Sequence, residues 1–131
     1  MQSSEVLQDS EELTEATRIL KALAAPKRLR ILSELMIGES CNCVLNEKLG
    51  MPSNLLSHHL RTLSDVNLIT SRRDSIDGRW IYYSVDRESV YRRQTWFIEF
   101  LNPARIQFRP LCGPEGQPCT EELSGSLGNI N

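Results

Sequence analysis

Two short helical segments joined by a tight turn, between residues 40 and 67, limit the folds open to this chain more than any other feature. The first segment is expected to begin with Ser40 as its N-cap and to end at Gly50. Pro52 and Ser53 start the second segment, and Asn67 follows it where a left-handed cap is wanted. Their buried residues are expected to be Val44, Leu45, Leu49, Leu56, Leu60 and Leu63. Two helices with a glycine-containing turn between them form a helix-turn-helix pattern.

A β-hairpin is predicted directly after this pair of helices. Residues 68–73 and 80–85 are rich in strand-forming side chains, and Asp77-Gly78 between them is a turn signal. The hairpin carries arginines at positions 72, 73 and 79. A helix-turn-helix followed by an arginine-bearing hairpin is typical of a winged helix, so the expected fold is mainly α with one β-hairpin.

Three further helices are expected to complete the domain. The first runs over about 10–24 after a capping box of Asp9 and Glu12, and the last runs over 86–101 with Asp86 as its cap. Pro26 begins the remaining one, which ends near Gly38. Its expected buried stripe is Leu29, Leu32, Leu35 and Met36, and its expected solvated face is Lys27, Arg28 and Arg30.

The first and last helices are more apolar than a small core requires. The last one has a large apolar face made of Val90, Trp96, Phe97, Phe100 and Leu101. Aromatic side chains in such number on a terminal helix favour a second protein surface that buries them. We therefore expect a homodimer that forms through the first and last helices.

The length of 131 residues, 40% of them hydrophobic, suits one domain with a modest core. The predicted organisation is a flexible arm over 1–9, the winged helix-turn-helix domain over 10–101, and an irregular tail over 102–131 that contains cysteines. The sequence has neither an apolar run of about 20 residues nor a basic, apolar start. We expect a cytoplasmic protein with no membrane partner and no required cofactor.

The four cysteines lie at positions 41, 43, 112 and 119. In a cytoplasmic chain they are expected to be reduced thiols or metal ligands rather than a disulfide framework. Cysteines two residues apart point about 200° apart in a helix and to opposite faces in a strand. Cys41 and Cys43 therefore converge on one ligand only if the backbone there is irregular or becomes so. Thiolates favour soft ions, and trivalent arsenic or antimony suits a pyramidal set of three thiolates.

Four matching segments occur in order between residues 20 and 91. They are Leu23-Ala-Ala-Pro-Lys-Arg-Leu-Arg-Ile-Leu32, Cys41-Asn-Cys43-Val-Leu45, Ser53-Asn-Leu-Leu-Ser-His-His-Leu-Arg-Thr-Leu63, and Arg72-Arg73 with Gly78-Arg79-Trp80-Ile-Tyr-Tyr83. In these segments the chain resembles the arsenic-repressor (ArsR/SmtB) family of bacterial metal-responsive transcription regulators. The resemblance implies a homodimeric winged-helix repressor that leaves its operator DNA when a metal or metalloid binds.

The chain departs from the family patterns at the ligand positions. The arsenic-sensing pattern has a third cysteine where this chain has Asn46. The related cadmium and lead sensors have further cysteines in the N-terminal arm, whereas this chain has none before Cys41. The last helix also lacks the histidine of zinc and nickel members. Cys112 and Cys119 are therefore the candidates to complete a site with Cys41 and Cys43. The eleven residues from Leu101 to Cys112 span at most about 36 Å, so either subunit's thiol pair is within reach.

These observations predict a repressor induced by As(III) or Sb(III), with a redox-sensing or Cd/Pb-sensing repressor of the same fold as the alternative. The sequence does not distinguish methylated arsenicals from the other possible inducers, or Cys112 from Cys119 as the third ligand. It also does not specify the operator or the regulated genes. A thiol oxidoreductase is disfavoured, because the chain has neither Cys-x-x-Cys nor a thioredoxin-like frame. The formal net charge of -2 disfavours only a generally basic DNA binder, since arginines concentrate locally.

The expected DNA contacts lie on the second helix of the pair and on the hairpin. They are Ser53, Asn54, Leu55, Ser57, His58, Arg61, Arg72, Arg73 and Arg79. The adjacent His58 and His59 diverge on a helix, which favours DNA contact or core packing over a shared metal. A symmetric dimer predicts two half-sites roughly 34–36 Å apart, or a multiple of that distance.

Overall fold

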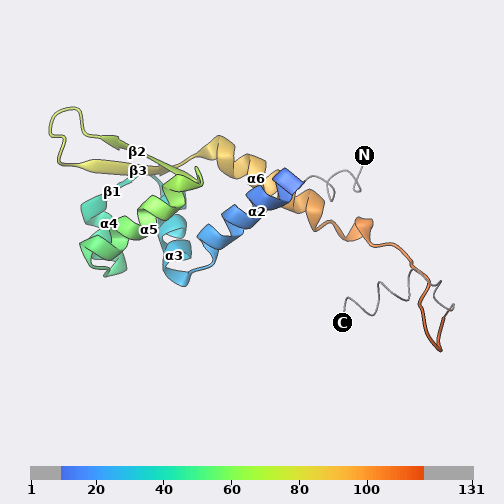
Figure 1. The fold of residues 1–131 in the computed structure, drawn as a ribbon. Helices are drawn as coiled ribbons and strands as arrows, with labels where there is room; N and C mark the ends of the chain where they lie inside the picture. The colour runs from blue at the N-terminus through green and yellow to red at the C-terminus, as the bar shows by residue number, and fades with distance from the viewer. Residues whose placement is uncertain (1–9, 117–131) are drawn as a thin grey trace. The chain divides into compact units, whose positions relative to one another are not determined.

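The structure, a computed structural model, describes residues 10–116 of the chain, which divides into two compact units after Leu101. The order of elements in the first unit is α2 (Ser10–Leu23), α3 (Pro26–Ile37), β1 (Ser40–Cys41), α4 (Asn42–Leu49), α5 (Ser53–Asp65), β2 (Ile69–Arg73), β3 (Ile81–Val85) and α6 (Arg87–Phe100) (Figure 1). The described part of the second unit holds one 3-10 turn, η1 (Pro103–Arg105), followed by irregular chain. No helix within residues 10–116 is long and apolar enough to cross a membrane.

The predicted helix-turn-helix is confirmed in α4 and α5. Gly50 ends α4 with a φ of 64°, in the left-handed region, and its N–H bonds to the Asn46 carbonyl. Asn67 follows α5 with a φ of 63°, as the sequence predicts. The inner stripe of α5 is also as expected, since Leu56, Leu60 and Leu63 are buried.

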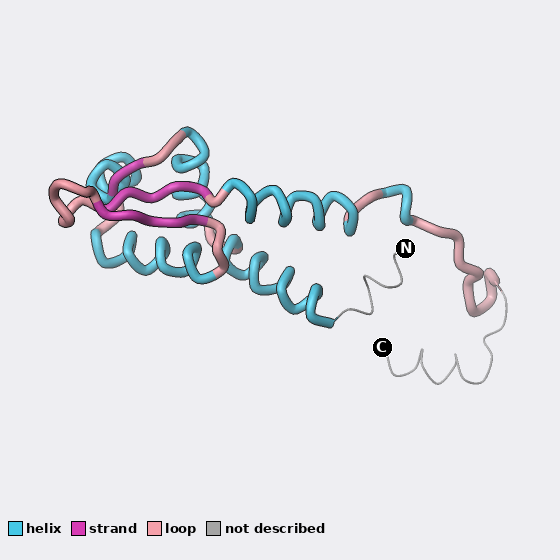
Figure 2. Tube along the Cα trace, turned by 90° about the horizontal axis from the view of Figure 1, so that it is seen from above, coloured by secondary structure: helices cyan, strands magenta, loops and turns pink. Residues whose placement is uncertain are grey.

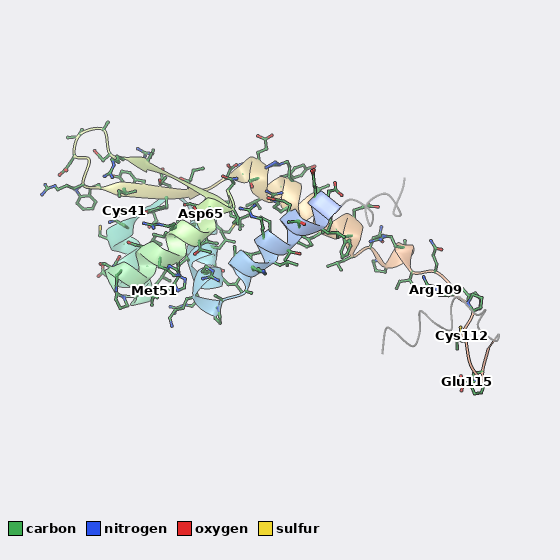
Figure 3. All side chains as sticks on the ribbon, in the orientation of Figure 1. Cys41, Met51, Asp65, Arg109, Cys112 and Glu115 are labelled. Atoms are coloured by element: carbon green, nitrogen blue, oxygen red, sulfur yellow. The ribbon has the colours of Figure 1, made fainter. Side chains whose placement is uncertain are left out.

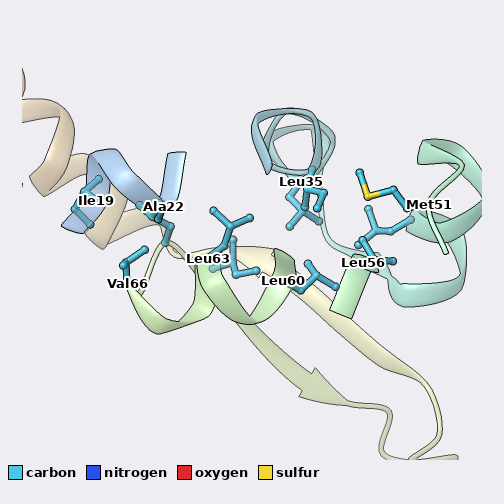
Figure 4. Close-up of a cluster of buried hydrophobic side chains, with 12 residues drawn as sticks. Ile19, Ala22, Leu35, Met51, Leu56, Leu60, Leu63 and Val66 are labelled. Carbon is cyan, nitrogen blue, oxygen red and sulfur yellow. The ribbon is translucent and has the colours of Figure 1, made fainter. Parts of the chain in front are cut away.

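The hydrophobic core lies between α5 and the helices before it (Figure 4). Its fully buried members include Ile19 of α2, Ile31 of α3, Leu45 of α4, and Leu56 and Leu63 of α5. Helices α2, α3 and α4 thus each contribute a buried residue that positions α5. Burial of apolar side chains at about 25 cal/mol per Å² is the main force that fixes this helix.

Two expected buried stripes are partly wrong. In α3 the buried residues are Ile31 and Leu35, whereas Leu29 and Met36 are exposed by 48% and 56%. At about 100° per residue, Leu29 and Met36 fall on the arc opposite Ile31, so the helix buries a narrow stripe only. Val44 of α4 is likewise exposed by 41%, while Leu45 is fully buried.

Ser40 is not the N-cap of α4, which corrects the sequence interpretation. Ser40 and Cys41 form β1, which pairs antiparallel with β3 through Ser40 with Tyr83 and Cys41 with Tyr82. Cys41 is the residue at the N-cap position. The open edge of β3 accepts the backbone of residues 40 and 41, and this pairing is not encoded in a two-residue sequence pattern. The resulting sheet has the order β1-β3-β2.

The hairpin of β2 and β3 and the last helix are confirmed where the sequence predicts them. Asp86 caps α6 by accepting a hydrogen bond from the Ser89 N–H. Both views show α2 and α6 extending from the end of the sheet opposite the hairpin tip (Figure 1, Figure 2). Arg93 of α6 pairs with Glu15 of α2 at 2.9 Å, and the Trp96 indole N–H donates to Glu12. The capping box at Asp9 lies outside the described residues.

Candidate functional site

The thiols of Cys41 and Cys43 lie against each other at the start of α4. Their sulfur atoms are 3.1 Å apart, with Cys41 buried and Cys43 exposed. Cys41 is the extended last residue of β1 (φ -84°, ψ 161°), and the helix begins at Asn42. Figure 3 shows Cys41 beside the strands. The strand-to-helix junction is the irregular backbone that convergence requires, so the two sulfurs meet before any ligand binds.

The environment makes the two thiols unequal. Burial raises the pKa of the Cys41 thiol, but the hydrogen bond to Cys43 and the nearby N–H groups of Val44 and Cys43 outweigh it, so the net pKa is lowered. The hydrogen bond to Cys41 raises the pKa of Cys43. Cys41 is therefore the sulfur that first becomes a thiolate, at the positive end of a short helix.

The thiol pair brings together two of the predicted ligands. Within residues 10–116 no group of three or more His, Cys, Asp and Glu side chains is arranged to hold a metal ion. Asn46 stands at the place of the missing third cysteine, and its Nδ2 donates to the Met51 carbonyl at 3.3 Å and to Ser53 Oγ at 2.9 Å. Asn46 therefore braces α4 against the first turn of α5.

The tail cysteines belong to the second unit. Cys112 lies in its described part and is disulfide-bonded in the structure, so the expectation of a reduced thiol is wrong at this position. Its sulfur needs reduction before it can ligate. Cys119 lies outside the described residues. A role for either as third ligand stays a prediction.

The outward side of α5 presents a polar surface. Most of its predicted contact residues are exposed, namely Ser53, Asn54, Ser57, His58 and Arg61. Leu55 differs, because it is partly buried against the core. Helix α5 thus combines an apolar inner side, which holds it, with an outer side of hydrogen-bonding groups suited to DNA.

His59 and Arg28 form an internal contact that the sequence interpretation missed. His59 is only 8% exposed, and its Nδ1 lies 3.1 Å from Arg28 Nη1. Arg28 also donates from Nε to the Ala22 carbonyl at 2.6 Å, at the end of α2. Arg28 is therefore not part of a solvated face. Desolvation, followed by the positive charge of Arg28, lowers the pKa of His59 and favours the neutral ring.

All three hairpin arginines bond within the hairpin or to Glu39, which directly precedes β1. Arg72 donates from Nε and Nη2 to the two Glu39 oxygens, both at 2.9 Å. Arg73 donates to the Gly78 carbonyl at 2.7 Å, and Arg79 pairs with Asp77 at 2.8 Å. The pKa of Glu39 is lowered mainly by its bond from Arg72, and that of Asp77 mainly by its bond from Arg79. Exposed ion pairs of this kind are weak.

Comparison with known proteins identifies this architecture. Residues 25–71 match the family model described as bacterial regulatory protein, arsR family. The arsenical resistance operon repressor of Bacillus subtilis is 42% identical over 82 residues, which cover 62% of this chain and 75% of that protein. The chain belongs to the arsR family. Members of this family are DNA-binding transcription regulators, and this chain is an arsR-family transcriptional repressor with a winged helix-turn-helix fold.

Solved structures agree with the arsR assignment. The crystal structure of NolR from Sinorhizobium fredii is 36% identical, covers 72% of this chain and 91% of NolR, and has a TM-score of 0.57. A homodimeric winged helix-turn-helix DNA-binding domain from Mycobacterium bovis is similar in fold, with 23% identity, a TM-score of 0.58, and coverage of 78% of this chain and 94% of that one.

The sequence interpretation did not single out Glu39 and Asp74 of the site, and it did not predict the structural role of Asn46. Glu39 holds Arg72, Asp74 accepts a hydrogen bond from Tyr82 Oη at 2.7 Å, and Asn46 links the two helices of the helix-turn-helix. Only Asp74 had a sequence signal, as an acid in a turn, because a side chain's distant partner is not readable from local pattern. Cys41 and Cys43, in contrast, are placed together as the prediction of a shared ligand requires.

Proposed function

We propose that this arsR-family repressor binds operator DNA as a homodimer and is released when As(III) or Sb(III) binds the Cys41 and Cys43 thiolates. The observation that carries the proposal is the 3.1 Å separation of the two sulfurs at the start of the helix that braces α5. The similarity to an arsenical resistance operon repressor supports the choice of inducer. Such a pair needs little rearrangement to chelate one soft ion.

A third thiolate completes the pyramidal set. We propose that Cys112 or Cys119 supplies it after reduction, from either subunit. Arsenite, As(OH)3, then exchanges its three hydroxyls for three sulfurs and releases three water molecules, with no change in the oxidation state of arsenic. The lowered pKa of Cys41 favours its sulfur as the first nucleophile.

The proposed release begins in the first turn of α4. Cys43 must move when an ion enters between the sulfurs, and Asn46 lies one turn further along the same face. Through Asn46 the displacement reaches Ser53, the first residue of α5. Each tenfold loss of DNA affinity corresponds to about 1.4 kcal/mol, so a modest change in the position of α5 is sufficient for derepression.

The apolar surface on α2 and α6 supports the proposed homodimer. A groove of about 410 Å³ lies between these helices, lined by residues that include Ala16, Ile19, Trp96 and Phe97. On the same helices Leu20, Tyr91 and Ile98 are exposed by 51%, 66% and 63%. Exposed apolar side chains in this number fit a second copy of the chain better than water.

The test is a titration of the reduced protein, bound to labelled DNA from its own promoter region, with arsenite, cadmium and zinc in parallel. Arsenite is expected to release the wild type, and the Cys41→Ser, Cys43→Ser double variant is expected to stay bound. Continued release of that variant by arsenite would contradict the proposal. Release by zinc alone would overturn the assignment of the site.

The same 3.1 Å contact favours a redox sensor as the second candidate. Oxidation of two adjacent thiols gives a disulfide, although a bridge between residues two apart is strained. An oxidant arm in the same titration distinguishes the two functions. Release by peroxide, with no response to arsenite in reduced protein, would favour the redox sensor.

A further inference from the structure

One face of the three-stranded sheet joins the thiol pair to the wing, which is the hairpin of β2 and β3 with the turn between them (residues 69–85). Tyr82 of β3 lies opposite Cys41 of β1 on one side and opposite Arg72 of β2 on the other. Residues directly opposite in antiparallel strands have their side chains on the same face. Cys41, Tyr82 and Arg72 therefore form one row across the sheet.

The Arg72 and Tyr82 side chains of this row are in contact. The Arg72 guanidinium lies over the Tyr82 ring, 4.6 Å from its centroid. The Glu39 carboxylate holds Arg72 through Nε and Nη2, and it also accepts a hydrogen bond from Ser84 Oγ at 3.1 Å. Glu39 is two residues before Cys41, so Arg72 is tied to the strand that carries the buried thiol.

The row continues into the tip of the hairpin. Tyr82 Oη donates to Asp74 Oδ2, while Asp74 Oδ1 accepts the backbone N–H groups of Ile76 and Asp77. The hydrogen bond to Asp74 raises the pKa of Tyr82. The Tyr82 side chain therefore links the middle of the row to the turn between β2 and β3.

We propose that Glu39, Arg72 and Tyr82 are positioning residues that transmit ligand binding at Cys41 to the wing and withdraw Arg72 from DNA. This inference rests on the proposed function, and it adds a second route beside the one through Asn46 and α5. A metalloid bonded to Cys41 replaces the 3.1 Å contact between the two sulfurs. The end of β1 then shifts, and Glu39 no longer presents Arg72 to a phosphate.

The ion pair between Arg72 and Glu39 is weak enough to be changed by a small movement of β1. The side chains of Arg72 and Glu39 are 59% and 38% exposed, and exposed ion pairs are weak. A small displacement is therefore enough to change the orientation of the guanidinium. The hairpin also offers a matched control, because Arg79 and Asp77 form a similar exposed pair within the wing turn, with no bond to β1.

The experiment compares wild type, Glu39→Gln and Asp77→Asn as full-length reduced proteins on DNA from the promoter region. The measured quantity is the ratio of the DNA Kd with arsenite to the Kd without it, beside protection of Cys41 and Cys43 from alkylation. Glu39→Gln is expected to keep the protection but to lower the ratio by about threefold to tenfold, since both protomers lose the link. Asp77→Asn is expected to keep the wild-type ratio within about twofold.

Each other outcome counts against the inference. An unchanged or larger ratio in Glu39→Gln, or an equal fall in Asp77→Asn, would overturn it. Loss of thiol protection in Glu39→Gln would also overturn it, because Glu39 would then support ligand binding rather than transmit it. A ratio of one in the wild type is the distinct result that would refute the proposed function itself, and the inference with it.

Discussion

Helix α5, the second helix of the helix-turn-helix, and the wing are both predicted to contact DNA, yet they are held in place by different interactions. Helix α5 rests on Leu56, Leu60 and Leu63, which are exposed by 2% or less. The wing rests on exposed polar contacts, such as Arg72 with Glu39 and Arg79 with Asp77. Apolar burial is insensitive to salt, whereas exposed ion pairs are screened by it.

Because of this difference, the position of α5 is fixed by the core, whereas the position of the wing can change more easily. A helix fixed by the core keeps its geometry until the domain unfolds, and a shift in it needs a push from a packed neighbour such as α4. A hairpin held by exposed ion pairs can respond to a displacement of the adjacent strand. The thiol pair lies at the junction of both, since Cys41 ends β1 and Cys43 lies in the first turn of α4.

The largest effect is expected when the support of the helix is removed. Leu60→Ala creates a cavity beneath α5 and should lower the free energy of unfolding by about 2–5 kcal/mol. Chemical denaturation measures the change, and Arg61→Ala on the outer side should alter stability by less than about 0.5 kcal/mol. Equal losses in the two variants would contradict the assignment of inner and outer sides.

Both DNA-contacting regions depend on the proposed dimer to be paired on an operator. Trp96→Ala removes the ring that stacks on Phe100 at 4.8 Å and should weaken dimerisation by about 2 kcal/mol, the cost of losing an interface anchor. Sedimentation equilibrium measures it, with Glu88→Gln in the first turn of α6 as the control. A monomeric wild type, or an unchanged dimer in Trp96→Ala, would refute the interface.

Acid should weaken the support of α5. His59 has a lowered pKa in the folded state, so its contribution to stability is present above about pH 6.5 and is lost as pH falls through the folded pKa. The free energy of unfolding should then decrease by at most about 1.4 kcal/mol per pH unit for this one proton. Denaturation at several pH values should show the slope in wild type and His58→Gln. Persistence of the same slope in His59→Gln would contradict the assignment.

The smallest expected effect concerns the wing alone. Arg79→Gln should reduce the slope of log Kd against log salt for DNA binding by about one per protomer, because one phosphate contact is lost. Fluorescence anisotropy at several salt concentrations measures it. Ser57→Ala on α5 removes no charge and should leave the slope unchanged. A steeper slope in Arg79→Gln than in wild type would exclude a phosphate contact.

Local sequence pattern predicted the parts of the fold that local physics determines. The capping of α6 by Asp86, the turns at Gly50 and Asn67, and the stripe of Leu56, Leu60 and Leu63 are all confirmed. Each depends on a residue type and its near neighbours. The same reasoning misassigned Leu29 and Met36, because an apolar residue on a helix does not reveal which side finds a partner.

The site was predictable in its members but not in its geometry. Cys41 and Cys43 stand out in the sequence, yet their convergence depends on β1, which exists only because β3 offers an open edge. The partners of Arg72 and Arg28 lie 33 and 31 residues away along the chain, at Glu39 and His59. Contacts of this kind follow from tertiary structure. The sequence pattern therefore assigned Arg28 to solvent and Arg72 to DNA without predicting their internal partners.

Occupation of the Cys41–Cys43 pair by arsenite can be measured directly. Reduced protein is alkylated with iodoacetamide in the presence and absence of arsenite, and mass spectrometry reads each cysteine separately. We expect arsenite to slow the alkylation of both Cys41 and Cys43, whereas an equal concentration of zinc should not. Alkylation of the two thiols at the same rate with and without arsenite would contradict this expectation.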